Sequence, residues 1–204
     1  MTKKFERLKE TASQTAGPYV HIGLTPNFTG IEKLYAKDLG SSMVNAETKG
    51  ERITISGRVF DGADAPLTDA LLEIWQADAA GLYNSPSETR GSADPNFPGW
   101  GRCSTHMESG VYTFETIKPG RVPFSDGSMM APHISFWIVA RGINVGLQTR
   151  LYFSDEQAAN AKDPILNCVE GKERVPTLVG QRNGDTYTFD IRLQGAGETV
   201  FFDI

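Results

Sequence analysis

The chain has 204 residues, of which 39% are hydrophobic and 22% are charged, so it can bury the core of one large domain. Its net charge of −5 argues against a nucleic-acid-binding protein, which needs a basic surface. The apolar runs are too short to cross a membrane, and no apolar stretch follows the charged N-terminus as in a signal peptide. We therefore expect a cytoplasmic protein in which Cys103 and Cys168 are free thiols.

The first 50 residues differ in composition from the rest of the chain. Around Gly17 and Pro18 the sequence is small, polar and unsuited to regular structure. We expect an extended N-terminal arm over residues 1–50, followed by one domain over residues 51–204. Ordering irregular backbone costs about 1–2 kcal/mol per residue, so the arm should dock, either on its own domain or on a partner chain. Within the arm, short helical pieces are expected at residues 5–12 and 31–39.

Alternating apolar and polar residues, separated by Gly, Pro and Asp turns, predict short strands in the domain. The expected strands are residues 53–60, 71–76, 110–117, 131–141, 147–153, 186–193 and 199–202, and short helices are expected at 156–161 and 176–179. Helices and strands do not alternate as in a parallel βαβ fold. The predicted fold class is all-β, an antiparallel β-sandwich with an extended N-terminal arm and short peripheral helices.

The stretch A-P-H-I-S-F-W-I-V-A-R at residues 131–141 has the composition of a buried strand, around which the rest of the chain is organised. Side chains alternate between the two faces of a strand, so His133, Ser135 and Trp137 share one face. A metal site on this face would use two histidines spaced two residues apart, and a serine stands where the second would be. A lone histidine at a strand start is more often a hydrogen-bonded structural residue.

Other patterns give weak signals. The G-A-G stretch at 195–197 lacks the third glycine and the lysine of a phosphate-binding loop, so a turn is expected there. Cys103 and His106 lie close in sequence, but nothing completes a nucleophilic triad. His106, Glu108 and His133 imitate an iron-binding facial triad, although Glu108 is expected in the turn before a strand. From these residues alone, the chain is a β-sandwich of unassigned function.

Several stretches, taken together, resemble the intradiol ring-cleaving dioxygenases. They are S-Q-T-A-G-P-Y-V-H-I-G at 13–23, G-R-V-F-D-G-A-D-A-P-L-T-D-A-L-L-E-I-W-Q-A-D-A-A-G-L-Y at 57–83, D-P-N-F-P-G-W-G-R at 94–102, T-I-K-P-G at 116–120, A-P-H-I-S-F at 131–136, A-R-G-I-N at 140–144 and G-E-T-V-F-F-D-I at 197–204. They occur in the right order over nearly the whole chain, which is far more specific than any single motif. Within the family, the chain is most similar to the subunit of a heteromeric member that does not hold the iron.

In that family a catalytic chain binds ferric iron through two tyrosines and two histidines. The resemblance places Thr89 and Val122 at the tyrosine positions, and His133 and Ser135 at the histidine positions. An arginine expected three residues before the first histidine is replaced by Met130. Because one ligand of four is kept, the resemblance implies that this chain holds no metal and no catalytic residue, and that Fe(III) is bound by a homologous beta subunit.

The resemblance also implies a role in the substrate pocket, at the contact between the two subunits. Gly17 and Pro18 would line this pocket, and Arg141 would supply a permanent cation for a catechol that carries a carboxylate. A surface salt bridge is the alternative for Arg141. The implied reaction is cleavage of protocatechuate by dioxygen to 3-carboxy-cis,cis-muconate, in an alpha–beta hetero-oligomer of aromatic-compound catabolism. A self-sufficient dioxygenase with an unusual site, and a ligand-binding or structural β-sandwich without an enzymatic partner, stay open as alternatives.

Overall fold

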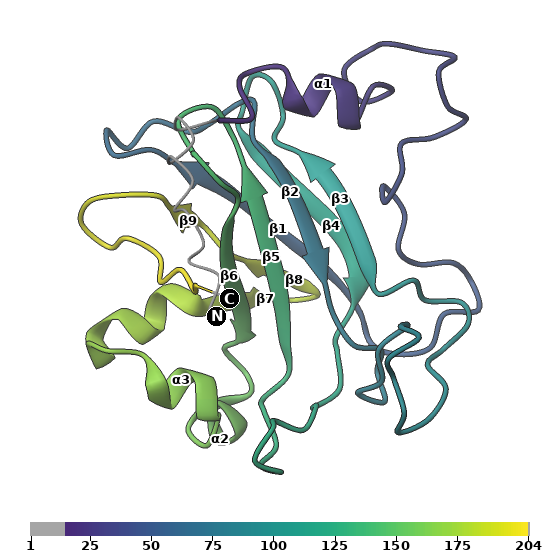
Figure 1. The fold of residues 1–204 in the computed structure, drawn as a ribbon, viewed down its shortest axis with the longest axis vertical. Coiled ribbons are helices and arrows are strands. Elements are labelled where there is room, and N and C mark those ends of the chain that lie inside the picture. The colour runs from purple at the N-terminus through teal and green to yellow at the C-terminus, as the bar shows by residue number, and fades with distance from the viewer. Residues whose placement is uncertain (1–14, 204) are drawn as a thin grey trace, which may run out of the picture.

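The computed structural model of the chain describes residues 15–203, so the helical turn expected at 5–12 lies outside the described residues. One sheet forms the body of the molecule, and its strands follow the order β3-β2-β5-β6-β7-β8-β1-β4, with β9 paired to β1 (Figure 1). The two end strands, β3 and β4, lie in contact, so the sheet curls into a nearly closed structure.

The elements within residues 15–203 are all short. The strands are β1 (Arg52–Phe60), β2 (Leu71–Trp75), β3 (Trp100–Ser104), β4 (Val111–Ile117), β5 (His133–Val139), β6 (Leu147–Phe153), β7 (Val179–Asn183), β8 (Thr186–Thr188) and β9 (Ile191–Arg192). The helices are α1 (Val20–Leu24), α2 (Gln157–Asn160), α3 (Pro164–Cys168) and the 3-10 helix η1 (Lys172–Leu178). No helix in this part of the chain is long and apolar enough to cross a membrane.

The core lies between the two halves of the curled sheet and is rich in aromatic side chains. Phe136 of β5 contacts the rings of Tyr112 and Phe114 on β4 and of Phe189 after β8, with ring centroids 6.0, 6.1 and 5.4 Å apart. All four residues are buried, and burying a phenyl ring contributes roughly 1.5–3 kcal/mol. Ile134, Phe136 and Ile138, which share one face of β5, are all buried in this core.

The all-β prediction is confirmed, whereas the purely antiparallel arrangement is wrong. The pairs β1–β8, β1–β9 and β6–β7 are parallel. A parallel neighbour needs a long crossover rather than a hairpin. Residues 154–178, which contain α2, α3 and η1, form such a crossover between β6 and β7.

Several expected elements differ from those observed. The expected strand at 186–193 is split into β8 and β9, and the expected strand at 199–202 is wrong, because only an isolated bridge between Gln148 and Phe202 forms there. β3 and β7 were not predicted. The helix expected at 156–161 is confirmed as α2, and the one expected at 176–179 corresponds to the end of η1.

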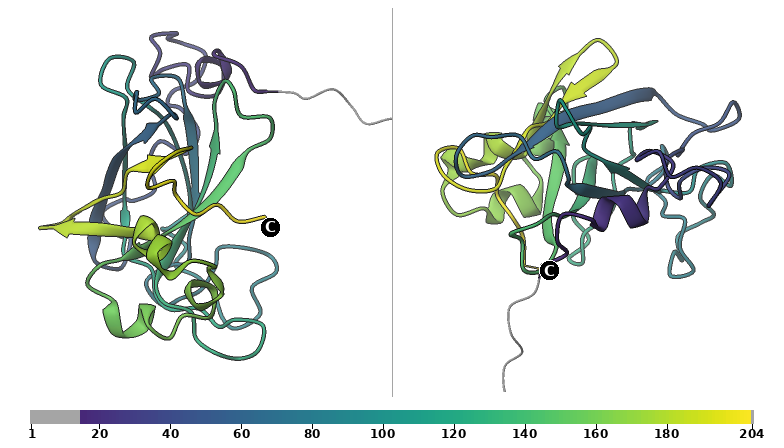
Figure 2. Two further views of the ribbon diagram at one scale, coloured as in Figure 1. Left: turned by 90° about the vertical axis from the view of Figure 1, so that its left-hand side faces the viewer. Right: turned by 90° about the horizontal axis from the view of Figure 1, so that it is seen from above.

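The described part of the arm runs along the side of the sheet opposite to α2 and α3 (Figures 1 and 2). Hydrogen bonds attach it to the domain: Thr25 Oγ1 lies 2.6 Å from Ser104 Oγ, and the Arg102 amide donates to the Gly40 carbonyl at 2.9 Å. The helical piece expected at 31–39 is wrong. The Asp38 carboxylate accepts the amides of residues 27 and 28 at 2.9 and 2.8 Å, which folds this segment into a loop.

Candidate functional site

The positions that the resemblance assigns to metal ligands lie at the end of the sheet where β5 begins. Thr89 and Val122 line one pocket of about 340 Å³, together with Trp75 and Tyr83. Trp75 pairs in register with Ser135, so this pocket adjoins the face that Ser135 shares with His133. The structure therefore gathers all four sequence-predicted positions at one end of the molecule.

The side chains at these positions do not fit a ferric ion. Val122 is buried in an apolar cluster with Ala77 and Met130 and offers no donor atom. His133 is buried, and its Nδ1 lies 2.8 Å from the Ala131 carbonyl, to which the neutral ring donates. Burial, and then the charge of Arg150, lower the pKa of His133 to about 4. Among residues 15–203, no three His, Cys, Asp or Glu side chains gather as a possible metal site.

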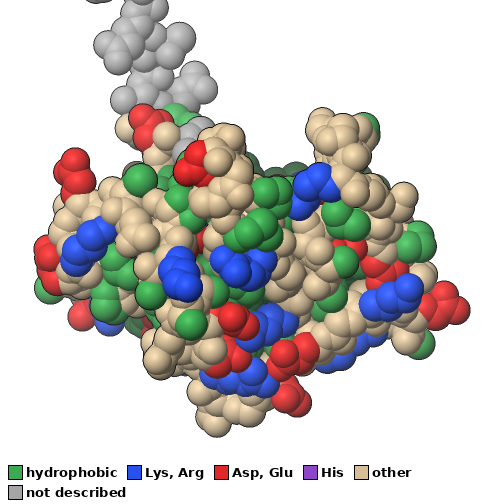
Figure 3. All heavy atoms as spheres, turned by 90° about the horizontal axis from the view of Figure 1, so that it is seen from below, with side chains coloured by type: hydrophobic (Ala, Val, Ile, Leu, Met, Phe, Trp, Pro, Cys, Tyr) green, Lys and Arg blue, Asp and Glu red, His purple; other side chains and the backbone are tan. Residues whose placement is uncertain are grey.

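Arg150, which sequence reasoning missed, stands among these positions. It pairs in register with Ser135 across β5 and β6, and its Nη1 lies 3.6 Å from the Met130 sulfur. Burial raises the pKa of Tyr83, and the Arg150 charge opposes this rise. Basic, acidic and apolar side chains are mixed on this end of the molecule (Figure 3). This end of the molecule therefore carries the Arg150 guanidinium near the four predicted positions, of which only His133 has a metal-binding side chain.

Arg141, Gly17 and Pro18 lie together at the opposite end of β5. Thr15 Oγ1 donates to the Ala140 carbonyl at 3.2 Å, next to Arg141, and the Gly17 amide lies 3.5 Å from the same hydroxyl. Gly17 adopts φ +74°, a left-handed conformation that suits glycine, and the chain turns there into α1. The Thr15–Ala140 hydrogen bond therefore holds the segment that contains Gly17 and Pro18 beside the loop that contains Arg141.

The two groups of predicted residues are far apart within this chain. The seven residues of β5 rise about 3.3 Å each, so its ends are about 20 Å apart. His133 begins the strand, and Arg141 follows its last residue by two positions. Arg141 therefore cannot reach a ligand bound at the His133 end.

Arg141 makes an ion pair with Asp69, a residue that sequence reasoning missed. The guanidinium Nε lies 2.8 Å from Asp69 Oδ2. The side chain of Arg141 is 60% exposed, whereas that of Asp69 is 8% exposed. Asp69 precedes β2 in sequence by two residues, and no motif links it to Arg141, so the pairing follows from the fold alone.

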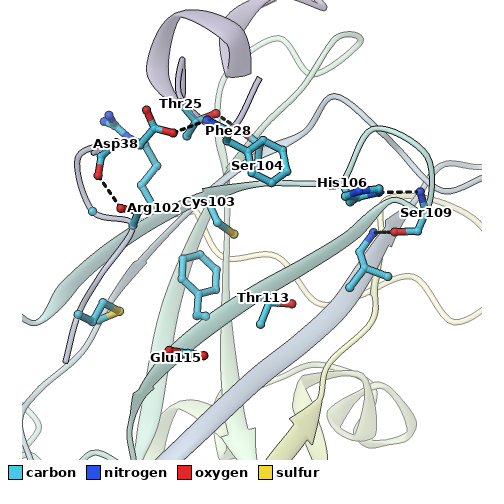
Figure 4. Close-up of a pocket in the computed structure, with 15 residues that line it drawn as sticks. Thr25, Phe28, Asp38, Arg102, Cys103, Ser104, His106, Ser109, Thr113 and Glu115 are labelled. Atoms are coloured by element: carbon cyan, nitrogen blue, oxygen red, sulfur yellow. Dashed lines mark hydrogen bonds between the residues drawn. The ribbon is translucent and has the colours of Figure 1, made fainter. Parts of the chain in front are cut away.

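A further pocket of about 540 Å³ lies between the arm and strands β3 and β4 (Figure 4). His106 lines it, but its Nδ1 accepts the amides of Glu108 and Ser109, both at 3.3 Å, within the turn before β4. Cys103 also lines it, and burial raises the pKa of this thiol well above its usual range. Both cysteines are free, as predicted. The His106–Glu108–His133 triad does not form, because Ser104 pairs with Leu71 and Leu71 with Val139, at the end of β5 remote from His133.

Comparison with known proteins identifies the family of the chain. A family model described as "Dioxygenase" matches residues 25–195. The protocatechuate 3,4-dioxygenase alpha chain of Pseudomonas putida is 46% identical over 202 residues, which cover 97% of this chain and 98% of that one. This chain belongs to the intradiol dioxygenase family.

Other members of the intradiol dioxygenase family match less closely. The alpha chain of the same enzyme from Burkholderia cepacia is 40% identical over 97% of this chain and 98% of that one, and the beta chain is 36% identical over 80% and 77%. A dioxygenase domain from Streptomyces sp. SirexAA-E has a TM-score of 0.54 at 31% identity, covering 76% of this chain and 88% of that one. The 3-chlorocatechol 1,2-dioxygenase of Rhodococcus opacus shares the fold, with a TM-score of 0.58 at 24% identity over 76% and 65% of the two chains.

Proposed function

We propose that this chain is the alpha-type, iron-free subunit of a protocatechuate 3,4-dioxygenase, and that it helps to form the substrate pocket of a homologous beta chain. The assembled enzyme cleaves protocatechuate with dioxygen to 3-carboxy-cis,cis-muconate, in cytoplasmic catabolism of aromatic compounds. Fe(III) belongs to the beta chain and supplies the oxygenation chemistry there. The names and coverage of the two alpha-chain relatives support this assignment.

The observation that carries the proposal is the separation of the two predicted groups of residues. Gly17, Pro18 and Arg141 lie at one end of β5, and the positions that correspond to metal ligands lie at the other. The proposed substrate-binding residues are about 20 Å from the vestigial metal site of their own chain, so we propose that they contribute to the active site of another chain. Arg141 then binds the ring carboxylate of protocatechuate, and Gly17 and Pro18 form a rigid wall of the pocket.

The arm, residues 1–50, is proposed to dock on the beta chain in a higher-order alpha–beta hetero-oligomer. Among residues 15–203, seven of the eleven exposed large apolar side chains lie between residues 19 and 39. Tyr19, Leu34 and Leu39 are 76%, 59% and 60% exposed. Apolar side chains gathered in this way are typical of a surface that another protein covers.

Iron analysis tests the absence of a metal site. The chain expressed alone should be colourless and free of stoichiometric iron, because one imidazole cannot retain a ferric ion. Co-expression with a homologous beta chain should give a complex that holds iron and cleaves protocatechuate. A tyrosinate-to-iron absorption band from the isolated chain would support the self-sufficient alternative, and failure to form any complex would support the sandwich without an enzymatic partner.

Substitution of Arg141 tests its role in the assembled enzyme. Arg141→Ala should raise the KM for protocatechuate by about tenfold or more, since a hydrogen bond to a charged group contributes about 1.5–3 kcal/mol. Catechol, which has no carboxylate, should be unaffected. Equal losses for the two substrates would remove the proposed role of Arg141.

A further inference from the structure

Asp69 is a buried carboxylate with an unusual set of contacts. Among residues 15–203, neither of its oxygens accepts a hydrogen bond, and both are shielded from solvent. An ionised carboxylate in such a position is costly unless a cation lies beside it. Arg141 is that cation, with its Nε 2.8 Å from Oδ2. The two residues therefore depend on each other in the free chain.

The contact leaves most of the guanidinium available. A guanidinium has five N–H donors, of which the Nε carries one and the two terminal nitrogens carry four. The Nε lies nearest to Asp69, and the side chain of Arg141 is 60% exposed. Two parallel N–H groups in a fixed fork are the geometry that binds a carboxylate in a bidentate manner. Asp69 thus attracts the guanidinium by its charge while most of the Arg141 side chain remains exposed.

Hydrogen bonds hold the backbone on both sides of Asp69. The Leu67 amide donates to the Val59 carbonyl at 2.8 Å. The Ala70 carbonyl accepts the Thr105 amide at 2.9 Å, and the Ala70 amide donates to Thr105 Oγ1 at 3.1 Å. Arg141 lies in the loop after β5, directly before Gly142 with φ +82°. The buried Asp69 carboxylate therefore stands on backbone held by hydrogen bonds, and the exposed Arg141 side chain contacts it.

We propose that Asp69 is a positioning residue that holds the Arg141 guanidinium ready for the carboxylate of the substrate. This inference rests on the proposed function, in which Arg141 binds that carboxylate. A free arginine side chain has about 2 kcal/mol of rotamer entropy to lose when it binds a ligand. Holding the guanidinium in advance removes part of this cost, so Asp69 strengthens the binding of anionic catechols without touching them.

The test uses the assembled alpha–beta enzyme and the ratio of KM for protocatechuate to KM for catechol. Asp69→Asn removes the charge in nearly the same shape, and Asp69→Glu keeps the charge but moves it by one methylene. Both should raise the ratio about threefold to tenfold, from the part of the rotamer entropy that is restored, with kcat unchanged. In an Arg141→Ala background, Asp69→Asn should leave the ratio as it is.

Two further variants distinguish positioning of Arg141 from the effect of removing a negative charge elsewhere on the surface. Asp64→Asn removes the same charge from an exposed residue that pairs with Arg192, and it should leave the ratio unchanged. Arg141→Lys is an exposed change that should not affect folding. The lysine ammonium keeps the charge but lacks the planar fork of parallel N–H groups that binds a carboxylate in a bidentate manner, so the ratio should rise.

The outcomes distinguish this inference from the function on which it rests. If Arg141→Ala raises the ratio but both Asp69 variants behave as wild type, positioning by Asp69 is wrong and the function of Arg141 stands. If Asp69→Asn lowers the KM for protocatechuate, Asp69 opposes binding by its charge, which also overturns the inference. If Arg141→Ala leaves the ratio unchanged, the proposed role of Arg141 fails, and that of Asp69 fails with it.

Discussion

Asp163 joins three parts of the chain, and its replacement should be severely destabilising. Its Oδ1 accepts the amides of Ile165 and Leu166, both at 2.9 Å, as the N-cap of α3. The same oxygen accepts the Tyr152 hydroxyl of β6 at 3.2 Å, and Oδ2 accepts the Ala131 amide before β5 at 2.7 Å. The residue is fully buried. One carboxylate thus holds the crossover helix against the two central strands.

The expected cost follows from these four contacts. Asp163→Ala removes an N-cap, which contributes about 1 kcal/mol, and leaves the buried Ala131 amide and Tyr152 hydroxyl unsatisfied at about 1–3 kcal/mol each. The free energy of unfolding should therefore fall by about 4 kcal/mol. Asp163→Asn can keep the cap through its amide oxygen, but its NH₂ then faces the Ala131 amide, so a loss of about 2 kcal/mol is expected.

Urea-induced unfolding, followed by tryptophan fluorescence, measures these differences. Asn167→Ala, an exposed change on the same helix, is the matched control and should alter the free energy of unfolding by no more than about 0.5 kcal/mol. The reasoning is refuted if Asp163→Ala costs no more than this control. It is also refuted if the Asn variant is less stable than the Ala variant.

Two further predictions concern stability. His133 has a pKa of about 4 in the folded state and near 6.5 in the unfolded state, so the unfolded state binds the proton more readily. The stability that the neutral His133 contributes is therefore present above about pH 6.5 and is lost as the pH falls towards 4. Between pH 7 and pH 5 the loss should be about 2 kcal/mol, and His133→Asn should remove most of this slope in urea titrations at the two pH values. Gly57→Ala should cost at least about 3 kcal/mol in the same assay, because its Cβ would lie 1.9 Å from the Phe189 carbonyl oxygen. Gly23→Ala, with nothing within 4 Å of the added carbon, is its control and should be tolerated; equal effects of the two glycine changes would contradict the clash.

Strands with a clear alternation could be predicted from the sequence, and those shaped by distant contacts could not. β1, β4 and β5 each show buried residues at alternate positions. β3 was missed because its W-G-R-C-S sequence is typical of a loop. Gly101 of this strand packs against Met43 in the arm, and a larger residue would clash, because an added Cβ would lie 2.4 Å from the Met43 sulfur. The signal for this strand therefore comes from packing between segments far apart in the chain.

The candidate site divides in the same way. Motifs located Arg141 and the positions 89, 122, 133 and 135, because these residues stand at fixed offsets from recognisable stretches. Asp69 and Arg150 were missed, since each acts through a neighbour across the fold: Asp69 through an ion pair with Arg141, and Arg150 through its register with Ser135. Sequence spacing carries no information on such contacts until the strand order is known.

Because β5 separates the two ends of the molecule, each end can change while the other keeps its geometry. Effects of substitutions more than about 7–10 Å apart usually add, and the ends of β5 are about twice that distance apart. The pocket beside Thr89 and Val122 is thus a place where an engineer could introduce new ligand-binding side chains while leaving Arg141 undisturbed. One strand thus keeps a redesigned pocket at its first residue apart from the ion pair of Arg141 beyond its last.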